Sequence, residues 1–273
     1  MEDDLALLTA AAAEAGPIAL RFWNRAPKAW DKEDGSGPVT EADLAVNRML
    51  EGRLRAARPD YGWLSEESPD TPDRLTAQRV FIIDPIDGTR AFIAGEPSFA
   101  HALAVAEAGR VVAGVVYLPA KAIVYAATAT GPATRNNQPI GASARTGIEG
   151  ARALAGAAAF APEHWPGGVP AMTRSFRPSL AWRMCLVADG SFDATLTPRP
   201  AWEWDIAAGT LIATRAGATV TDRDGAALHF NRLDPRSDGL ITAAPGLHAA
   251  LMQRRRGEGV TPDTMRAAPS PPH

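Results

Sequence analysis

Two aspartates, Asp84 and Asp87, follow a short run of β-branched and aromatic residues at positions 80–83. Such a run is typical of a buried strand. Pro85 predicts that the strand ends there, because proline has no N–H to donate to the ladder. Neighbouring carboxylates repel each other, and burying either one unpaired is costly. A divalent cation between them would remove both costs, and the backbone carbonyl of Ile86 could be a further oxygen ligand.

The same stretch has other interpretations. An Asp-Gly pair often closes a hairpin turn without any chemistry. An EF-hand calcium loop needs acids at alternating positions and a distant glutamate, which this stretch lacks. A haloacid-dehalogenase-type phosphatase has a single residue between its two acids, whereas Asp84 and Asp87 are three positions apart. The spacing therefore favours a cation site, beside which Thr89 offers a hydroxyl group.

Two further acids stand at the ends of predicted elements. Thr40 is predicted to cap a helix that runs to about residue 57, and Asp43 completes a capping-box pattern. The capping role is enough to explain why a threonine stands at position 40. Asp43, at the start of the helix, could in addition face a neighbouring site. Glu66 follows a short predicted strand at 61–64 and could give the same cation a further carboxylate.

A further acid, Asp205, stands at the start of a predicted helix that ends at Gly217. An aspartate there is explained structurally as the N-cap of the helix. Trp202 and Trp204 lie beside it and small alanines follow, which indicates that this helix end packs closely against another element.

The composition, with 46% hydrophobic and 22% charged residues, describes an ordinary globular protein. A net charge of −3 provides no basic surface for a nucleic-acid polymer. The single cysteine, Cys185, excludes a disulfide framework and suits a reducing cytoplasm. We expect no membrane span, because no run of about 18 apolar residues occurs, and no secretory signal, because the N-terminus is acidic.

The predicted elements, helices followed by several antiparallel strands, favour an α+β fold. We predict an N-terminal α+β domain at 1–140, which carries most of the candidate metal ligands, and a C-terminal α/β domain at 141–256. Within the second domain, the apolar run 180–188 is compatible with either a helix or a strand. The polar, proline-rich tail at 257–273 is predicted to be disordered.

Four motifs together resemble the inositol monophosphatase superfamily, namely Pro38–Asp43, Ser65–Glu67, Asp84–Thr89 and Trp204–Gly209. Each motif alone is weak, but their shared order and spacing, within a resemblance that covers residues 5–250, are specific. The resemblance implies a layered α-β-α-β-α sandwich of the inositol monophosphatase/fructose-1,6-bisphosphatase type. It also implies a cytoplasmic, Mg²⁺-dependent hydrolase of a small phosphate monoester, usually a homodimer.

The resemblance also implies which residues would hold two or three Mg²⁺ ions. Glu66, Asp84 and the Ile86 carbonyl would hold a first, activating ion. A second ion would lie between Asp84, Asp87 and Asp205, and a weaker third would depend on Glu66 and water.

Catalytic and substrate-binding roles follow from the same resemblance. Asp43 and Thr89 would orient the attacking water, with Glu66 as a further catalytic residue. The backbone N–H groups of Gly88 and Thr89 would bind the phosphate, and Asp205 would contribute to substrate binding. Metal-assisted displacement of this kind needs no covalent enzyme intermediate.

The substrate is less clearly indicated than the reaction. Ala91 and Pro198 replace an Asn and a Glu that inositol-specific members tend to carry. The segments Glu203–Gly209 and Met184–Gly190 look more like 3'(2'),5'-bisphosphate nucleotidases, which convert adenosine 3',5'-bisphosphate to AMP. Thr89–Gly95 also resembles histidinol-phosphate phosphatases. We therefore favour the nucleotidase, with inositol-1-monophosphatase and histidinol-phosphate phosphatase as alternatives.

Two arginines, Arg90 and Arg199, could pair with a second phosphate of such a substrate. A catalytically silent binding protein on the same fold is a further alternative. It is disfavoured because none of the acids that the resemblance assigns to the site is missing.

Overall fold

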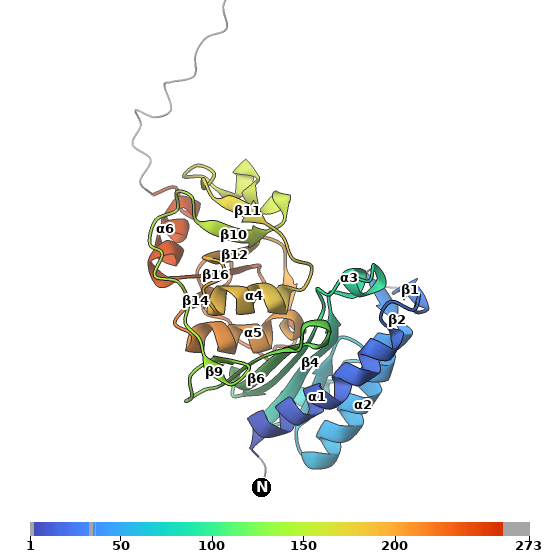
Figure 1. Ribbon diagram of the computed structural model, residues 1–273. Helices are drawn as coiled ribbons and strands as arrows, with labels where there is room; N and C mark the ends of the chain where they lie inside the picture. Colours follow the sequence, from blue (N-terminus) through green and yellow to red (C-terminus); the bar gives the residue numbers. More distant parts are fainter. Residues whose placement is uncertain (1–2, 33–34, 36, 259–273) are drawn as a thin grey trace, which may run out of the picture.

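The computed structural model describes residues 3–32, 35 and 37–258, so from residue 259 onward the tail predicted to be disordered lies outside the described residues. Helices and sheets alternate in layers (Figure 1). In order across the molecule, the helical layers are α1 (Asp4–Phe22) with α2 (Glu41–Ala57), α4 (Leu180–Ala188) with α5 (Glu203–Arg215), and α6 (Pro245–Arg255). A sheet lies between each pair of helical layers, which confirms the predicted α-β-α-β-α sandwich.

The first sheet is mixed, because β3 pairs parallel with β4 and the remaining neighbours pair antiparallel. Its order in the described part of the chain is β3 (Gly62–Ser65), β4 (Arg79–Asp87), β5 (Ala100–Glu107), β6 (Arg110–Leu118), β7 (Ile123–Thr128), β8 (Thr134–Arg135) and β9 (Gln138–Pro139). The Ala108–Gly109 turn has positive φ at both residues, which suits the tight hairpin that joins β5 to β6.

The helices α1 and α2 cover one face of the first sheet, with a buried apolar cluster between them that includes Leu8, Leu50 and Phe81. The start of α2 confirms the predicted capping box between Thr40 and Asp43. By length and composition alone, α1 could cross a membrane, whereas no such span was expected from the sequence. In this structure most of its apolar residues are packed within the same cluster, although Leu20 is exposed.

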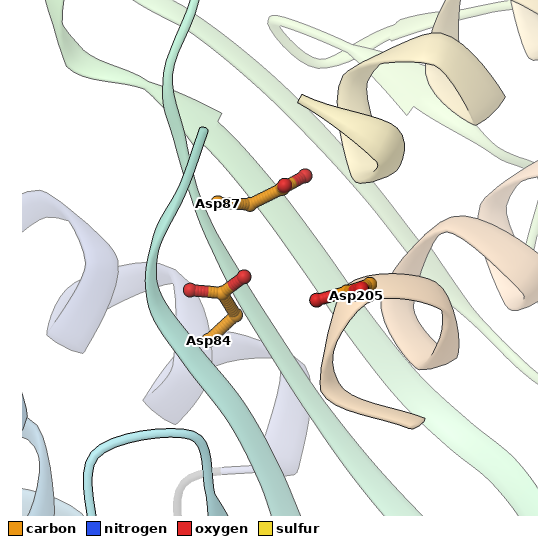
Figure 2. A group of neighbouring side chains, drawn as sticks. All are labelled: Asp84, Asp87 and Asp205. Carbon is orange, nitrogen blue, oxygen red and sulfur yellow. The ribbon is translucent and has the colours of Figure 1, made fainter. Parts of the chain in front are cut away.

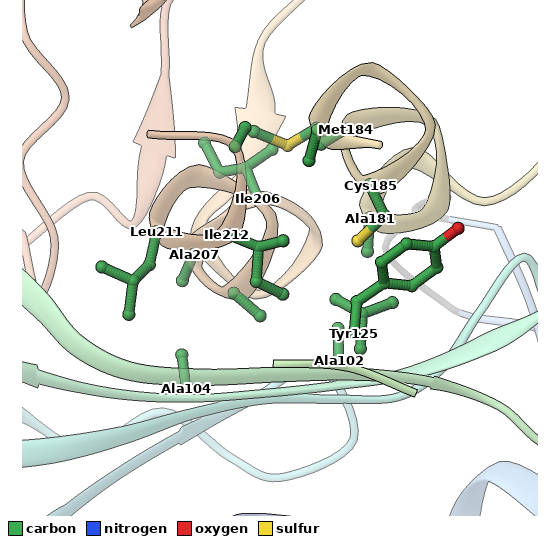
Figure 3. Close-up of a cluster of buried hydrophobic side chains, with 14 of the residues drawn as sticks. Ala102, Ala104, Tyr125, Ala181, Met184, Cys185, Ile206, Ala207, Leu211 and Ile212 are labelled. Carbon is green, nitrogen blue, oxygen red and sulfur yellow. The ribbon is translucent and has the colours of Figure 1, made fainter. Parts of the chain in front are cut away.

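The helices α4 and α5 pack against the opposite face of the first sheet, as Figure 3 shows. The run 180–188 is therefore a helix, and Cys185 is buried in this core. Gly114 of β6 permits a close approach, because an added Cβ would lie 3.1 Å from the Cα of Ala208 in α5. The position of α5 is thus set directly by the sheet backbone.

The second sheet is smaller and is covered on its outer face by α6. Its order in the described residues is β11 (Thr173–Ser175), β10 (Arg152–Ala155), β12 (Ala194–Thr197), β16 (Leu240–Ala243) and β14 (Thr219–Thr221). The remaining short elements are the strand pairs β1 (Ala29–Asp31) with β2 (Pro38–Thr40) and β13 (Ala201–Trp202) with β15 (Arg236–Ser237), the helix α3 (Thr89–Ile93), and the single turns η1 (Pro72–Leu75), η2 (Pro119–Lys121), η3 (Ala157–Phe160) and η4 (Pro162–His164).

Candidate active site

The sequence predicted that the strand ends at Pro85. In the structure, β4 continues through Pro85 to Asp87. Pro85 is tolerated because the ladder is interrupted at a β-bulge between Asp84 and Asp87. Both aspartates also remain buried, with 1% and 7% of their surface exposed, rather than emerging at the surface.

The bulge decides where the two carboxylates point. Residues three apart on a regular strand face opposite sides of the sheet. Here Asp84 pairs with Ala102 and Asp87 with Ala100, and these two partners lie on the same face of β5. Both aspartates therefore face the layer that contains α5.

Two local hydrogen bonds stabilise the bulged backbone. The Ile86 N–H donates to Asp84 Oδ1 at 2.9 Å, and the Thr89 hydroxyl donates to the Ile86 carbonyl at 3.1 Å. The side chains of the motif thus replace ladder partners that the bulge removes.

Asp205 approaches the bulge from α5, as Figure 2 shows. It is the third residue of the helix, whose N-cap position is taken by Trp202, so the alternative explanation as an N-cap does not hold. Carboxylate oxygens of Asp84, Asp87 and Asp205 lie within 4.8 Å of one another. We call these three residues the acid corner.

The acid corner is electrostatically unfavourable on its own. Burial, followed by the charges of Glu66, Asp87 and Asp205, raises the pKa of Asp84 well above its ordinary value. Burial and the charges of Asp87 and Glu66 likewise raise the pKa of Asp205. Each carboxylate therefore resists ionisation while the others are charged.

Asp87 is held in place by the start of α4. Its Oδ2 accepts hydrogen bonds from the Ser179 hydroxyl at 2.6 Å and the Ala181 N–H at 2.7 Å. Burial raises the pKa of Asp87 to about 6, although these hydrogen bonds and the charge of Arg183 favour its ionised form.

Asp43 and Thr89 meet beside the acid corner. The Thr89 hydroxyl lies 3.2 Å from Asp43 Oδ1, while Asp43 Oδ2 accepts from the N–H and hydroxyl of Thr40. Asp43 is fully buried, and this burial raises its pKa to about 6. The carboxylate is thus both a capping-box partner and a group that can exchange a proton near neutral pH.

Glu66 is placed next to β4 by a hydrogen bond from its N–H to the Ile83 carbonyl, 3.2 Å long. Its Oε1 lies 2.8 Å from Nζ of Lys32, and Glu67 pairs with the same ammonium at 2.7 Å. Burial disfavours the charged form of Lys32 and by itself would lower its pKa. The charges and hydrogen bonds of the two glutamates outweigh this effect, so the pKa of Lys32 is raised. Glu66 lies outside the acid corner, although its charge acts on Asp84.

A cavity of about 350 Å³ opens onto the acid corner and Glu66. Its walls also include Gly88, Thr89 and three arginines, namely the predicted Arg90 and Arg199 together with Arg183. Arg183 is buried, and its Nε has no hydrogen-bond partner among the described residues. Burial lowers the pKa of Arg183 to about 10, with the charge of Arg199 acting in the same direction.

The donor set fits a divalent cation. The acid corner offers carboxylate oxygens alone, which are the ligands that Mg²⁺ prefers in proteins. A cation between the three side chains would relieve the repulsion that raises their pKa values.

Comparison with known proteins places this geometry in a family. A model of the inositol monophosphatase family matches residues 1–259. The chain belongs to the inositol monophosphatase family. It is therefore an enzyme, a metal-dependent phosphatase.

Curated relatives of the chain carry two different names within this family. The chain is 33% identical to the 3'(2'),5'-bisphosphate nucleotidase CysQ of Salmonella typhimurium over 231 residues, which cover 80% of this chain and 90% of that protein. It is 34% identical to the inositol-1-monophosphatase of Rhizobium meliloti over 197 residues, which cover 68% of this chain and 73% of that protein.

Solved structures confirm the family fold. An IMPase from Thermotoga maritima is similar with a TM-score of 0.81 at 28% identity, covering 93% of this chain and 97% of that one. The extragenic suppressor protein suhB from Bartonella henselae gives 0.80 at 25% identity, covering 93% and 98%.

The structure also shows residues that sequence reasoning missed in this inositol monophosphatase family member. Ser179 and Lys32 were not singled out, because neither stands near a motif. Arg183 was overlooked within an apolar run, although a lone charge between Trp182 and Met184 in a core helix was a usable signal.

Proposed function

We propose that this protein uses Mg²⁺ to hydrolyse a phosphate monoester of a small bisphosphorylated nucleotide, with adenosine 3',5'-bisphosphate as the best candidate and AMP as its product. One observation carries the proposal: the acid corner lines the same cavity as Arg183 and Arg199. The acids would hold the metal beside the phosphate that is cleaved. The arginines would bind a second phosphate that is kept.

The metal site would be built from the acid corner, with the Ile86 carbonyl and Glu66 as further oxygen ligands. When bound, Mg²⁺ neutralises phosphate charge, lowers the pKa of a bound water and stabilises the leaving oxygen.

Asp43 and Thr89 would prepare the attacking water. The Thr89 hydroxyl donates its one proton either to Asp43 or to the Ile86 carbonyl, so its oxygen is free to accept a hydrogen bond from water. Asp43, with its raised pKa, would fix the hydroxyl and take up a proton near neutral pH. The backbone N–H groups of Gly88 and Thr89 would orient the phosphate.

The arginines support a second phosphate because Arg183 is a buried cation with unused donor capacity. Guanidinium groups bind phosphate through paired hydrogen bonds, which makes two of them in one cavity a suitable subsite. Phe176 lines the same cavity with 50% of its surface exposed, and its ring centre lies 5.3 Å from the Arg183 guanidinium. The ring could stack against a nucleobase.

The relatives support the phosphatase and differ on its substrate. The Salmonella relative is a bisphosphate nucleotidase, whereas the Rhizobium relative acts as an inositol-1-monophosphatase by its name. Inositol 1-phosphate is thus the second candidate. It carries a single phosphate, so Arg183 and Arg199 would have no second phosphate to bind.

The test is a comparison of kcat/KM with Mg²⁺ on adenosine 3',5'-bisphosphate, inositol 1-phosphate and histidinol phosphate. We expect the bisphosphate to exceed the others by about tenfold or more, which is the effect of a charge-assisted hydrogen bond. A higher value for inositol 1-phosphate would overturn the substrate assignment.

A substitution of Arg199 tests whether this residue binds the second phosphate. Arg199→Gln should lower kcat/KM for the bisphosphate by about tenfold and leave adenosine 3'-monophosphate nearly unchanged. Arg174→Gln is the matched control, because Arg174 is exposed like Arg199 but does not line the cavity.

A further inference from the structure

His101 lies opposite the β-bulge that carries the two aspartates. Between the paired positions Asp84–Ala102 and Asp87–Ala100, the residues Pro85 and Ile86 face the single residue His101. The imidazole is fully buried and packs near Tyr117, with ring centres 6.0 Å apart.

With the residues that the structure describes, the imidazole makes one hydrogen bond, to the bulged backbone. Its Nδ1 is bonded to the carbonyl oxygen of Pro85. A carbonyl can only accept, so Nδ1 must carry the proton and donate. The other ring nitrogen, Nε2, is buried without a partner among the described residues.

With this contact, each polar backbone group of Pro85 and Ile86 has a hydrogen-bond partner. Pro85 has no N–H, and its carbonyl is bound by His101. The N–H and carbonyl of Ile86 are bound by Asp84 and Thr89. Within the described part of the chain, His101 is thus the one partner of the bulge that comes from the neighbouring strand rather than from the motif itself.

We propose that His101 is a positioning residue, which holds the bulge of β4 in the shape that turns Asp84 and Asp87 toward the same metal. The proposal rests on the proposed metal role of the acid corner. A regular ladder in place of the bulge would turn one of the two aspartates to the opposite face. The hydrogen bond to Pro85 therefore acts on metal affinity without touching the metal.

Calorimetric titration of Mg²⁺ into the purified full chain tests the proposal, because it reads affinity rather than activity. His101→Leu keeps the approximate volume but cannot donate, and we expect Mg²⁺ affinity to fall by about tenfold or more, as for other groups that orient metal ligands. His101→Asn places an amide N–H near the position of Nδ1 and should restore affinity to within about threefold of the wild type.

A second variant separates positioning from general loss of stability. Val105→Ala removes packing from the same face of the same strand, so it should lower the unfolding temperature without changing Mg²⁺ affinity. Equal Mg²⁺ affinity in His101→Leu and the wild type would overturn the positioning role, as would failure of His101→Asn to restore it. Absence of Mg²⁺ binding in the wild type would instead contradict the proposed function.

Discussion

The three acid-corner residues show how a single side chain can serve function at the expense of stability. Asp84 is almost fully buried and faces two other carboxylates, so ionising it in the folded protein is unfavourable without a cation. Residues that lower stability in this way are typical of active sites.

We predict that Asp84→Asn stabilises the metal-free protein and abolishes phosphatase activity. The amide keeps the oxygen that accepts from the Ile86 N–H and removes one of the repelling charges. In EDTA at pH 8, the free energy of unfolding should rise by about 1 kcal/mol, as measured by urea denaturation. Asp60→Asn, at an exposed position, should change nothing. A less stable Asp84→Asn protein would argue against repulsion in the acid corner.

A second prediction at the residue scale concerns pH. Burial lowers the pKa of His101 to about 4, despite the hydrogen bond to Pro85, from an ordinary value of 6.5. Between these values the unfolded chain binds a proton that the folded chain does not, so stability falls as pH falls. His101→Asn has no such group, and its unfolding free energy relative to the wild type should rise by about 2 to 3 kcal/mol between pH 7.5 and 4.5.

Denaturation of both proteins across this range measures the effect. The buried carboxylates with raised pKa values act in the opposite direction, but they are shared by both proteins and cancel in the difference. A difference that does not change with pH would show that His101 is protonated in the folded state.

At the scale of elements, the site depends on how closely α5 approaches the first sheet. An added Cβ at Gly114 would lie 3.1 Å from the Cα and 3.2 Å from the carbonyl oxygen of Ala208, and neither backbone atom can move without the helix. Because Asp205 belongs to this helix, its distance from β4 is set by a glycine on another strand.

We predict that Gly114→Ala displaces α5, lowers the unfolding free energy by about 1 to 3 kcal/mol and weakens Mg²⁺ binding. Gly52→Ala is the control, because Gly52 lies exposed in α2 with no atom within 4 Å of its added Cβ. That variant should be neutral or more stable by up to about 1 kcal/mol. Unchanged Mg²⁺ affinity in Gly114→Ala would show that the position of α5 does not limit the site.

Local signals in the sequence predicted individual helices and strands well, but they did not show how these elements contact one another in space. The strand over 80–83 and the capping box at Thr40 were confirmed because each depends on neighbours within a few residues. The continuation of β4 through Pro85 was missed, since a bulge is set by the register of the partner strand. The contact of Ser179 with Asp87 joins residues 92 positions apart, which no local pattern reveals.

At the scale of the whole molecule, the acid corner joins two layers of the sandwich. Asp84 and Asp87 belong to the first sheet, and Asp205 belongs to the helical layer between the sheets. The four motifs indicated this convergence only through the family resemblance, because spacing along the chain does not show which layers meet. The metal roles of Glu66 and Ile86, the homodimer and the cytoplasmic location remain predictions.

The most direct measurement is anomalous diffraction from crystals of the protein grown with Mn²⁺, an oxygen-preferring substitute for Mg²⁺. We predict an anomalous peak between the carboxylates of Asp84, Asp87 and Asp205, which is lost in Asp205→Asn. Well-ordered crystals with no peak there, or with the ion bound elsewhere, would contradict it.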